Sequence, residues 1–274
     1  MSADPAGWPA GRPLAISVNV MLEGWSESAA PGIGPMGNVL KQGVLDLQAR
    51  SWAEYGAAEG AWRLLDCLAH SGVKAVFYTS GVVAEVHLPL LRAIHAAGHA
   101  VAAHGWGQEI IPAYQTIVAE EADIARCGAA IEKAVGVRPR GWLSPRCTPS
   151  PATAALLAAS GFAWHADYFD RDLPRRLETE AGALVAMPFT MEVNDMPLYV
   201  RYGNEPEAFT RILARILAGW PQLASRPACL DITVHAHVFG RPYGAVELLR
   251  SLAIAQDCAQ AWLTTHEELA RLVA

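Results

Sequence analysis

The 274 residues are 52% hydrophobic and 18% charged, which is enough apolar material for one large core, and they carry a formal net charge of −6. The 18 arginines and three lysines are scattered without a basic block, which gives no support to a nucleic-acid surface. No segment approaches the roughly 20 consecutive apolar residues of a membrane span, and residues 1–13 lack the apolar run of a signal peptide. We therefore expect a soluble, cytoplasmic protein.

Short apolar runs alternate with amphipathic segments along the chain. Strands are predicted over residues 14–20, 74–79, 99–103, 141–143, 162–168, 183–189, 229–238 and 259–263. Helices are predicted over residues 57–70, 82–97, 117–135, 152–159, 208–219, 245–255 and 267–273. This alternation is typical of a parallel (β/α) barrel. Without an internal repeat or a linker, we expect one domain over residues 1–274, with residues 1–13 as an extended lead-in.

Polar and aromatic side chains gather immediately after the predicted strands. In parallel α/β sheets and barrels, ligands bind where the carboxyl ends of the strands meet, so we expect these side chains to surround one site. The candidate site residues are Glu23, Trp25, His104, Trp106, Arg146, Asp195, His235 and His237.

Carboxylates, imidazoles and an arginine at one mouth favour a hydrolase, because they provide acid–base groups and a fixed cation for a developing anion. His104 and His235 each end an apolar run, which favours a functional role over that of a structural histidine. His237 follows His235 by two residues and therefore shares its face of the predicted strand. Simpler interpretations stay open for three residues: a loop carboxylate for Glu23, a surface ion pair for Arg146 and an Asx-turn for Asp195.

The five cysteines, at positions 67, 127, 147, 229 and 258, show no Cys-x-x-Cys spacing. We expect reduced and mostly buried thiols, in agreement with a cytoplasmic location. Cys147 follows Arg146 in a loop, and no base stands beside it in the sequence, so a nucleophilic role is not favoured.

Six groups of residues occur in the order of a known family. They are Glu54-Tyr55-Gly56-x-x-x-Gly60-x-Trp62-Arg63-Leu64-Leu65, Gly98-His99-x-x-x-x-His104-Gly105-Trp106, Gly141-Trp142-x-x-x-Arg146-x-x-Pro149, Asp172-Leu173-Pro174, Asn194-Asp195-Met196 and His235-x-x-x-x-Gly240-Arg241-Pro242. Together they resemble the NodB-like polysaccharide deacetylase superfamily over about residues 14–265. The nearest branch is that of the metal-independent allantoinases and cyclic imide hydrolases.

The resemblance implies a deformed (β/α) barrel with about seven parallel strands, hydrolysis of a carbon–nitrogen amide bond, and a homo-oligomer. Metal-dependent members carry Thr-Phe-Asp-Asp after the first strand and a His-x-x-x-His pair. Here the corresponding positions read Val18-Asn19-Val20-Met21 and His104-x-x-x-Gln108. Catalytic zinc needs about three histidine or carboxylate ligands, so we expect no bound metal. A zinc site rebuilt from His104, Glu23 and His235 or His237 is the alternative.

We therefore expect a hydrolase of carbon–nitrogen (non-peptide) bonds in a small cyclic amide, imide or ureide. His104, His235 and Glu23 would act as general acid and base. The binding residues would be Arg146 at the oxyanion, Trp25 and Trp106 stacked on a flat ring, and Asp195 and His237 as further contacts. The stretch Glu23-Gly24-Trp25, around which the resemblance predicts a second acidic residue, disfavours allantoin itself. Two alternatives stay open: a metal-dependent deacetylase of an N-acetylated sugar, and an inactive binding protein.

Overall fold

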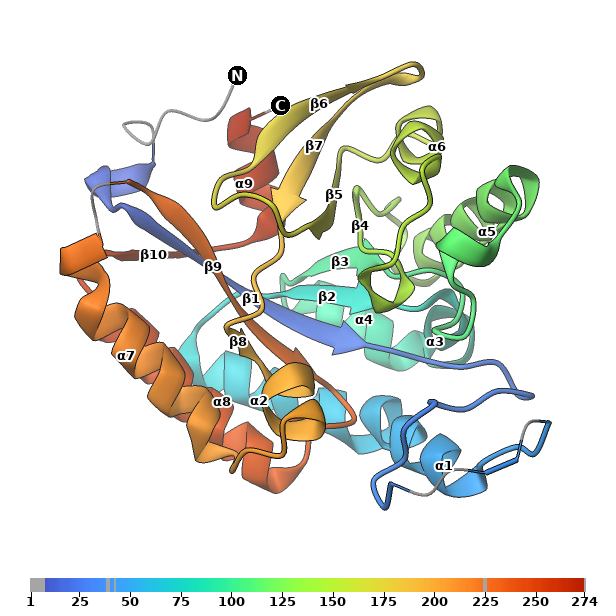
Figure 1. Ribbon diagram of the computed structural model, residues 1–274, viewed down its shortest axis with the longest axis horizontal. Coiled ribbons are helices and arrows are strands. Elements are labelled where there is room, and N and C mark those ends of the chain that lie inside the picture. Colours follow the sequence, from blue (N-terminus) through green and yellow to red (C-terminus); the bar gives the residue numbers. More distant parts are fainter. Residues whose placement is uncertain (1–7, 38–39, 42, 224–225, 274) are drawn as a thin grey trace.

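A computed structural model describes residues 8–37, 40–41, 43–223 and 226–273, so residues 1–7 of the predicted lead-in lie outside the described part. Its centre is a ten-stranded sheet in the order β6-β7-β5-β4-β3-β2-β1-β9-β8, with β10 paired to β1 (Figure 1). Its ladders are parallel except in the β6–β7 hairpin. The strands are β1 (Leu14–Leu22), β2 (Val76–Thr79), β3 (Ala100–Ala103), β4 (Gly141–Trp142), β5 (Trp164–Tyr168), β6 (Arg175–Thr179), β7 (Gly182–Pro188), β8 (Val193–Asn194), β9 (Ala228–His235) and β10 (Ala261–Thr264).

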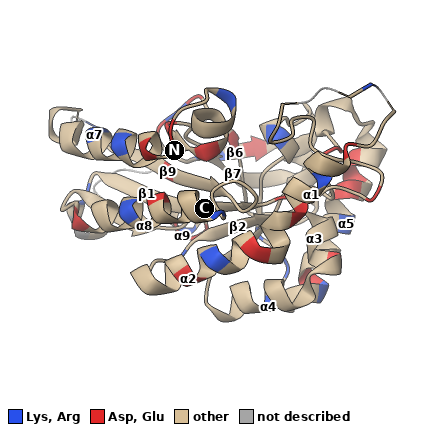
Figure 2. Ribbon diagram, turned by 90° about the horizontal axis from the view of Figure 1, so that it is seen from below, with Lys and Arg blue, Asp and Glu red and all other residues tan. Residues whose placement is uncertain are grey.

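Helices cover the convex face of the curled sheet, and Figure 2 shows acidic and basic residues interspersed along them. The helices are α1 (Leu47–Tyr55), α2 (Ala61–Ser71), α3 (Gly81–Val86), α4 (Leu88–Ala96), α5 (Ile117–Val135), α6 (Thr153–Ala159), α7 (Glu207–Leu223), α8 (Pro242–Asp257) and α9 (His266–Val273), of which α9 instead packs Leu269 and Ala270 into the apolar cluster inside the half-barrel. Two π-helical segments, Gly56–Gly60 and Met196–Arg201, complete the helical structure discussed below. Among the described residues, no helix combines the length and apolarity that crossing a membrane requires.

The mostly parallel sheet forms a half-barrel, which confirms the predicted α/β fold class. Strands β6 and β8 were not predicted, since β6 alternates on a largely exposed hairpin and β8 has two residues. The helix predicted over residues 82–97 is broken at His87 because Pro89 opens the next helix. The helix predicted from residue 57 is preceded by α1, which begins at Leu47.

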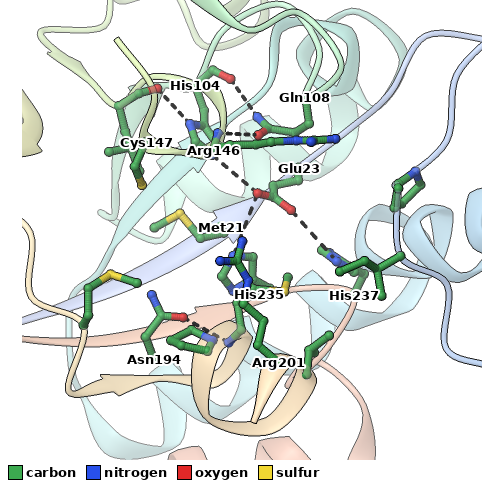
Figure 3. Close-up of a pocket in the computed structure, with 18 of the residues that line it drawn as sticks. Met21, Glu23, His104, Gln108, Arg146, Cys147, Asn194, Arg201, His235 and His237 are labelled. Carbon is green, nitrogen blue, oxygen red and sulfur yellow. Dashed lines mark hydrogen bonds and ion pairs between the residues drawn. The ribbon is translucent and has the colours of Figure 1, made fainter. Parts of the chain in front are cut away.

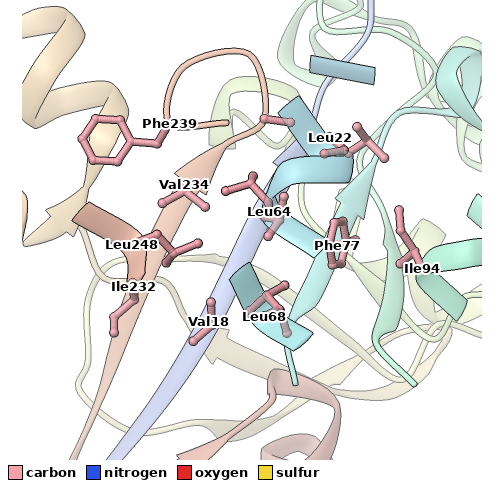
Figure 4. Close-up of a cluster of buried hydrophobic side chains, with 14 of the residues drawn as sticks. Val18, Leu22, Leu64, Leu68, Phe77, Ile94, Ile232, Val234, Phe239 and Leu248 are labelled. Carbon is pink, nitrogen blue, oxygen red and sulfur yellow. The ribbon is translucent and has the colours of Figure 1, made fainter. Parts of the chain in front are cut away.

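The first strand shows how the barrel interior is built. Its even-numbered residues, from Leu14 to Leu22, pack against the helices in the large apolar core, part of which is drawn in Figure 4. Its odd-numbered residues point into the half-barrel, where Ala15 and Met21 join a second apolar cluster. The strand extends two residues beyond the predicted end at Val20. Glu23 therefore follows the strand directly and continues the inward-facing series.

Strand β9 follows the same alternation. Ile232 and Val234 face the helices, whereas Asp231 and His235 face the interior. The strand ends at His235, so His237 belongs to the following turn, not to the strand on which it was predicted. Two hydrogen bonds link β9 to the segment after β7: the Thr190 amide donates to Asp231 Oδ2 at 2.7 Å, and the Asp231 amide donates to Thr190 Oγ1 at 2.7 Å. Side-chain bonds thus hold together two segments that share no ladder.

Candidate active site

A cavity of about 420 Å³ opens at the carboxyl ends of the strands, around the residues that follow β1, β3, β4 and β9 (Figure 3). Its walls are largely apolar and include two tryptophans. Its polar lining residues are Glu23, His104, Gln108, Arg146, Cys147, Asn194, Arg201, His235 and His237. Of the eight predicted site residues, six line this cavity: Glu23, Trp25, His104, Arg146, His235 and His237.

The carboxylate of Glu23 lies among three imidazoles. Its Oε1 is 3.6 Å from Nε2 of His104 and 3.8 Å from Nε2 of His235, and its Oε2 is 3.9 Å from Nε2 of His237. The three histidines come from the ends of two different strands and the turn after one of them, so the half-barrel brings together groups more than 200 positions apart. All four side chains are at most 11% exposed.

Hydrogen bonds to the other ring nitrogens determine what the imidazoles present to the cavity. Nδ1 of His104 lies 2.8 Å from the carbonyl oxygen of Leu143, which can only accept, so Nδ1 carries the hydrogen. In its neutral form, His104 then presents an unprotonated Nε2 on the side of Glu23. Nδ1 of His235 lies 2.6 Å from Oδ1 of Asp195, and its Nε2 also faces Glu23.

The mutual electrostatics of these groups separate their pKa values. Burial alone would raise the pKa of Glu23, but the imidazoles of His235, His104 and His237 outweigh it and lower the pKa to about 2. Burial alone would lower the pKa of His235, but the carboxylates of Asp195 and Glu23 outweigh it and raise the pKa. Burial lowers the pKa of His237 to about 4. The cluster therefore favours the carboxylate form of Glu23, the protonated form of His235 and the neutral form of His237.

Asp195 was predicted to contact the substrate, and the structure places its side chain behind the cavity lining. Its side chain is completely buried and does not line the cavity. Oδ1 binds Nδ1 of His235, while Oδ2 accepts hydrogen bonds from the backbone amides of His235 at 2.7 Å and Phe239 at 3.3 Å. Asp195 is therefore a positioning residue that fixes the orientation and the proton of His235.

Trp106 was predicted to stack on the substrate, and the structure likewise places its side chain away from the cavity lining. Its ring is 5% exposed and lies outside the cavity lining. The guanidinium of Arg126 lies 3.3 Å from the ring centroid, and the ring fills the space next to Gly81, where a Cβ would approach it to 2.6 Å. The left-handed backbone of Gly105, with φ of 68°, turns the chain so that the indole leaves the interior after His104 has entered it.

The remaining predicted binding residues border the cavity. Arg146 lines it from a strained turn with φ of 55°, and its backbone amide donates to Oε1 of Gln108 at 3.4 Å. Trp25 packs edge-on against His237 with ring centroids 5.9 Å apart. Trp52, which was not predicted, contacts the same imidazole at 4.5 Å. His237 is thus held between two indoles.

Two further lining residues, Asn194 and Arg201, were not among the eight candidate site residues. Asn194 ends β8, a strand of two residues that is too short to recognise from alternation. Arg201 ends the π-helical segment Met196–Arg201, which has neither the 3.6-residue period nor a cap. The only available signal was a polar residue in a long segment after a predicted strand.

The residues present do not fit the zinc site of the metal-dependent members. Among the described residues, no group of three or more histidine, cysteine, aspartate or glutamate side chains is arranged to hold a metal ion. Gln108 turns its amide nitrogen to the carbonyl oxygen of His104 at 2.9 Å and to Ser80 Oγ at 3.1 Å, and its oxygen accepts from Arg146. Gly24 offers no side chain, so Glu23 is left as the only carboxylate among the lining residues.

The fold and this site define an α/β half-barrel with an acid–base cluster at the carboxyl ends of its strands. The polysaccharide deacetylase family matches residues 53–164. The chain is similar to a Schizosaccharomyces pombe protein described as "Putative polysaccharide deacetylase", with 24% identity, covering 98% of this chain and 92% of that protein.

Two solved structures are similar to this chain over nearly its whole length. A "probable Polysaccharide deacetylase" from Pseudomonas aeruginosa PAO1 has a TM-score of 0.88 and 26% identity, covering 98% of this chain and 93% of that one. The structure of "Puue Allantoinase" has a TM-score of 0.88 and 25% identity, covering 98% and 92%. Residues 53–164 therefore match a polysaccharide deacetylase domain, and over nearly its whole length the chain shares the NodB-like fold of neighbours that include a probable deacetylase and an allantoinase.

Proposed function

We propose that this protein hydrolyses a carbon–nitrogen (non-peptide) bond of a small cyclic amide, imide or ureide without a bound metal. The observation that carries the proposal is the carboxylate of Glu23 within 3.6–3.9 Å of three imidazole Nε2 atoms inside a cavity of small-molecule size. The likeness to an allantoinase supports a cyclic ureide or a related ring over an acetylated sugar.

Two histidines divide the proton transfers because their environments differ. In the proposed mechanism, Nε2 of neutral His104 takes a proton from water as the water oxygen attacks the carbonyl carbon. Nε2–H of the His235 imidazolium gives a proton to the ring nitrogen as the carbon–nitrogen bond breaks. One water is consumed, and the products are a carboxylic acid and the freed amine or amide nitrogen. Glu23 keeps His235 protonated, and proton exchange with solvent restores both imidazoles.

The developing oxyanion needs a donor other than a metal ion, and Arg146 is the proposed one. It lines the cavity, and its backbone amide donates to Oε1 of Gln108, whose amide nitrogen donates to the carbonyl oxygen of His104. A fixed donor at such a position accelerates acyl transfer by about 10²–10³-fold. A cyclic imide or ureide carbonyl is also more electrophilic than an acetamide, so the protein needs less assistance from a Lewis acid. Trp25 and His237 would flank the ring of the substrate.

A substrate panel tests the proposal. Purified protein is assayed with cyclic imides, hydantoins, allantoin and N-acetylated sugars, before and after exhaustive treatment with a chelator, and its metal content is measured. We expect turnover of at least one ring substrate that survives chelation. The variant His235→Ala should lose that turnover by about 10²–10⁴-fold.

Three outcomes would contradict the proposal. Stoichiometric zinc with chelator-sensitive activity on an acetylated sugar would make the protein a metal-dependent deacetylase. Undiminished turnover by His235→Ala would remove the acid assignment. A thermal shift with a panel compound but no turnover of any compound would make it a binding protein.

We further propose that the protein is a cytoplasmic homo-oligomer. The cysteines of the described residues are free thiols, three of them buried, in agreement with a reducing compartment. The oligomer rests on the family resemblance. Light scattering after size exclusion tests it, and a mass of one chain, 29.3 kDa, would contradict it.

A further inference from the structure

The charges on the cavity wall do not balance. Two guanidinium groups, those of Arg146 and Arg201, line the cavity together with one carboxylate, that of Glu23. Glu23 is already surrounded by the three imidazoles. Both arginines are exposed at the mouth of the cavity, and within the described part of the chain neither guanidinium has a carboxylate within ion-pair distance. With His235 protonated, the cavity carries an excess of positive charge.

Arg201 and Asn194 lie on the same wall and offer hydrogen-bond donors without acceptors. Oδ1 of Asn194 accepts from the backbone amide of Met196 at 3.0 Å, which leaves Nδ2 as a donor on the cavity side (Figure 3). Arg201 ends the π-helical segment that begins at Met196, directly after Asn194 and Asp195. π-helical segments recur at functional sites because they bring side chains out of the regular helical register.

The rest of this wall cannot satisfy these donors. The neighbouring lining side chains of Met196, Pro197 and Val200 are apolar, as are Phe169 and Phe189 near the same opening. The charge of Arg201 is felt at the reaction centre, since it acts to lower the pKa of His235 against the two carboxylates. A neutral ring would offer the solvent-accessible guanidinium and the Asn194 amide only carbonyl oxygens, whereas a carboxylate would accept from both in charge-assisted hydrogen bonds.

Resting on the proposed function, we propose that Arg201 and Asn194 bind a carboxylate substituent of the substrate. The substrate class is then a cyclic amide, imide or ureide that bears a carboxylate, held at the end of the ring away from the bond that breaks. Arg146, beside Gln108 and His104, serves the developing oxyanion at the other end. Arg201 and Asn194 are specificity-determining residues that take no part in proton transfer.

Matched pairs of ring compounds test the inference. Dihydroorotate and dihydrouracil differ by one carboxylate, and so do hydantoin-5-acetate and 5-methylhydantoin. For each pair we compare kcat/KM in the wild type, in Arg201→Gln and in the control Arg211→Gln, which removes an exposed arginine of α7 that does not line the cavity. Loss of a charge-assisted hydrogen bond corresponds to about 10–100-fold.

We expect the wild type and Arg211→Gln to favour the carboxylate member of a pair by at least about 10-fold. Arg201→Gln should lower that preference by about 10–100-fold, mainly through KM. Asn194→Asp retains the acceptor for the Met196 amide but places a negative charge on the wall, and it should also lower the preference. An equal loss for both members of a pair, or a wild-type preference for the neutral member, would overturn the inference.

Calorimetric binding separates this inference from the proposed function. Dihydroorotate and hydantoin-5-acetate are titrated into wild type, Arg201→Gln and Arg211→Gln. Binding that Arg201→Gln weakens by about 10-fold or more, without turnover of any ring compound, would support the anion site and contradict the hydrolase. Turnover of neutral rings with no Arg201-dependent binding of the carboxylates would support the hydrolase and contradict the anion site.

Discussion

Two buried histidine–carboxylate pairs lie in the same half-barrel and differ in the second nitrogen of each ring. His266 binds Oδ1 of Asp231 at 2.7 Å through Nε2, and its Nδ1 binds the hydroxyl of Tyr78. His235 binds Asp195 through Nδ1, and its Nε2 faces Glu23 in the cavity. Both rings are nearly inaccessible to solvent, at 0% and 7% exposure. Burial and a carboxylate partner are common to both, so the unsatisfied nitrogen at a cavity is what distinguishes a catalytic candidate.

The pair around His266 serves the fold. Asp231 accepts from Asn19 at 2.9 Å and from the backbone amide of Thr190 at 2.7 Å, so it links β1, β9 and the segment after β7. Removing one partner of such a network leaves a buried charge or donor without compensation. The pair around His235 instead leaves one nitrogen free for a ligand. The comparison therefore predicts a loss of activity at one pair and a loss of stability at the other.

The largest effect is expected for His235→Asn. The asparagine Nδ2 can replace the donor to Asp195, so the positioning contact is retained while the acid at Nε2 is lost. We expect kcat/KM for the ring substrate to fall by about 10²–10⁴-fold. Urea unfolding should show a change below about 1 kcal/mol, because a hydrogen-bond partner remains. A loss of activity below about tenfold would remove His235 from the proton transfers.

The next largest effect is expected on the free energy of unfolding. Asp231→Ala removes the acceptor for His266, Asn19 and Thr190, and we expect the free energy of unfolding to fall by about 3–5 kcal/mol. Asp257→Ala, at the exposed end of α8, is the matched control and should stay within about 0.5 kcal/mol. Urea denaturation monitored by tryptophan fluorescence measures both. Equal stability of the two variants would show that the closed network is dispensable.

The comparison also explains how far the sequence could be interpreted. Apolar periodicity predicted the helix over residues 117–135 with both of its ends, because the pattern, the Thr116 cap and Gly136 agree. Glu23, His104 and His235 each come directly after a predicted strand or at its end, and this predicted that they would lie near one another. The same criterion could not distinguish Asp195 from these three residues. A side chain near the end of a strand can face the cavity or can bind a neighbouring side chain, and only the path of the backbone determines which.

Trp106 and Arg201 show two further reasons for failure. Trp106 follows His104 by two residues, and alternation would place both side chains on one face. The left-handed Gly105 breaks the alternation, and the indole pairs with Arg126, a residue of α5 that no local pattern links to it. Arg201 depends on a π-helical segment, whose register the usual helical period does not describe. Both depend on tertiary contacts or irregular backbone.

The dependence of kcat/KM on pH tests the proposed role of His235. The pKa of His235 is raised, so its imidazolium stabilises the fold below the unfolded pKa near 6.5, and that stability is lost as the pH rises through the folded pKa. The pKa of Glu23 is lowered to about 2, so its contribution is present above 4.5 and is lost as the pH falls toward 2. If His235 is the acid, kcat/KM should fall on the alkaline side, above pH 6.5.

Asp195→Asn should move that alkaline limb to lower pH. The substitution removes one of the two carboxylates that hold the pKa of His235 up, while burial continues to lower it. We expect the limb to shift by about one pH unit, as one nearby charge in a protein typically produces. The profiles of kcat/KM for the wild type and the variant, measured over pH 5–10, provide the comparison. An unshifted limb would assign the titrating group to a residue other than His235.

The smallest effects are expected for the two tryptophans that were predicted to stack on the substrate, and they should differ between KM and stability. Trp106→Phe removes part of the surface under the Arg126 guanidinium, so it should lower the free energy of unfolding by about 1 kcal/mol and leave KM within about twofold. Trp25→Phe changes a residue of the cavity wall next to His237, so it should raise KM several-fold with a smaller change in stability. Substrate saturation curves and urea denaturation of the two variants measure both quantities. A KM effect larger for Trp106→Phe than for Trp25→Phe would restore the stacking role that the buried position of Trp106 contradicts.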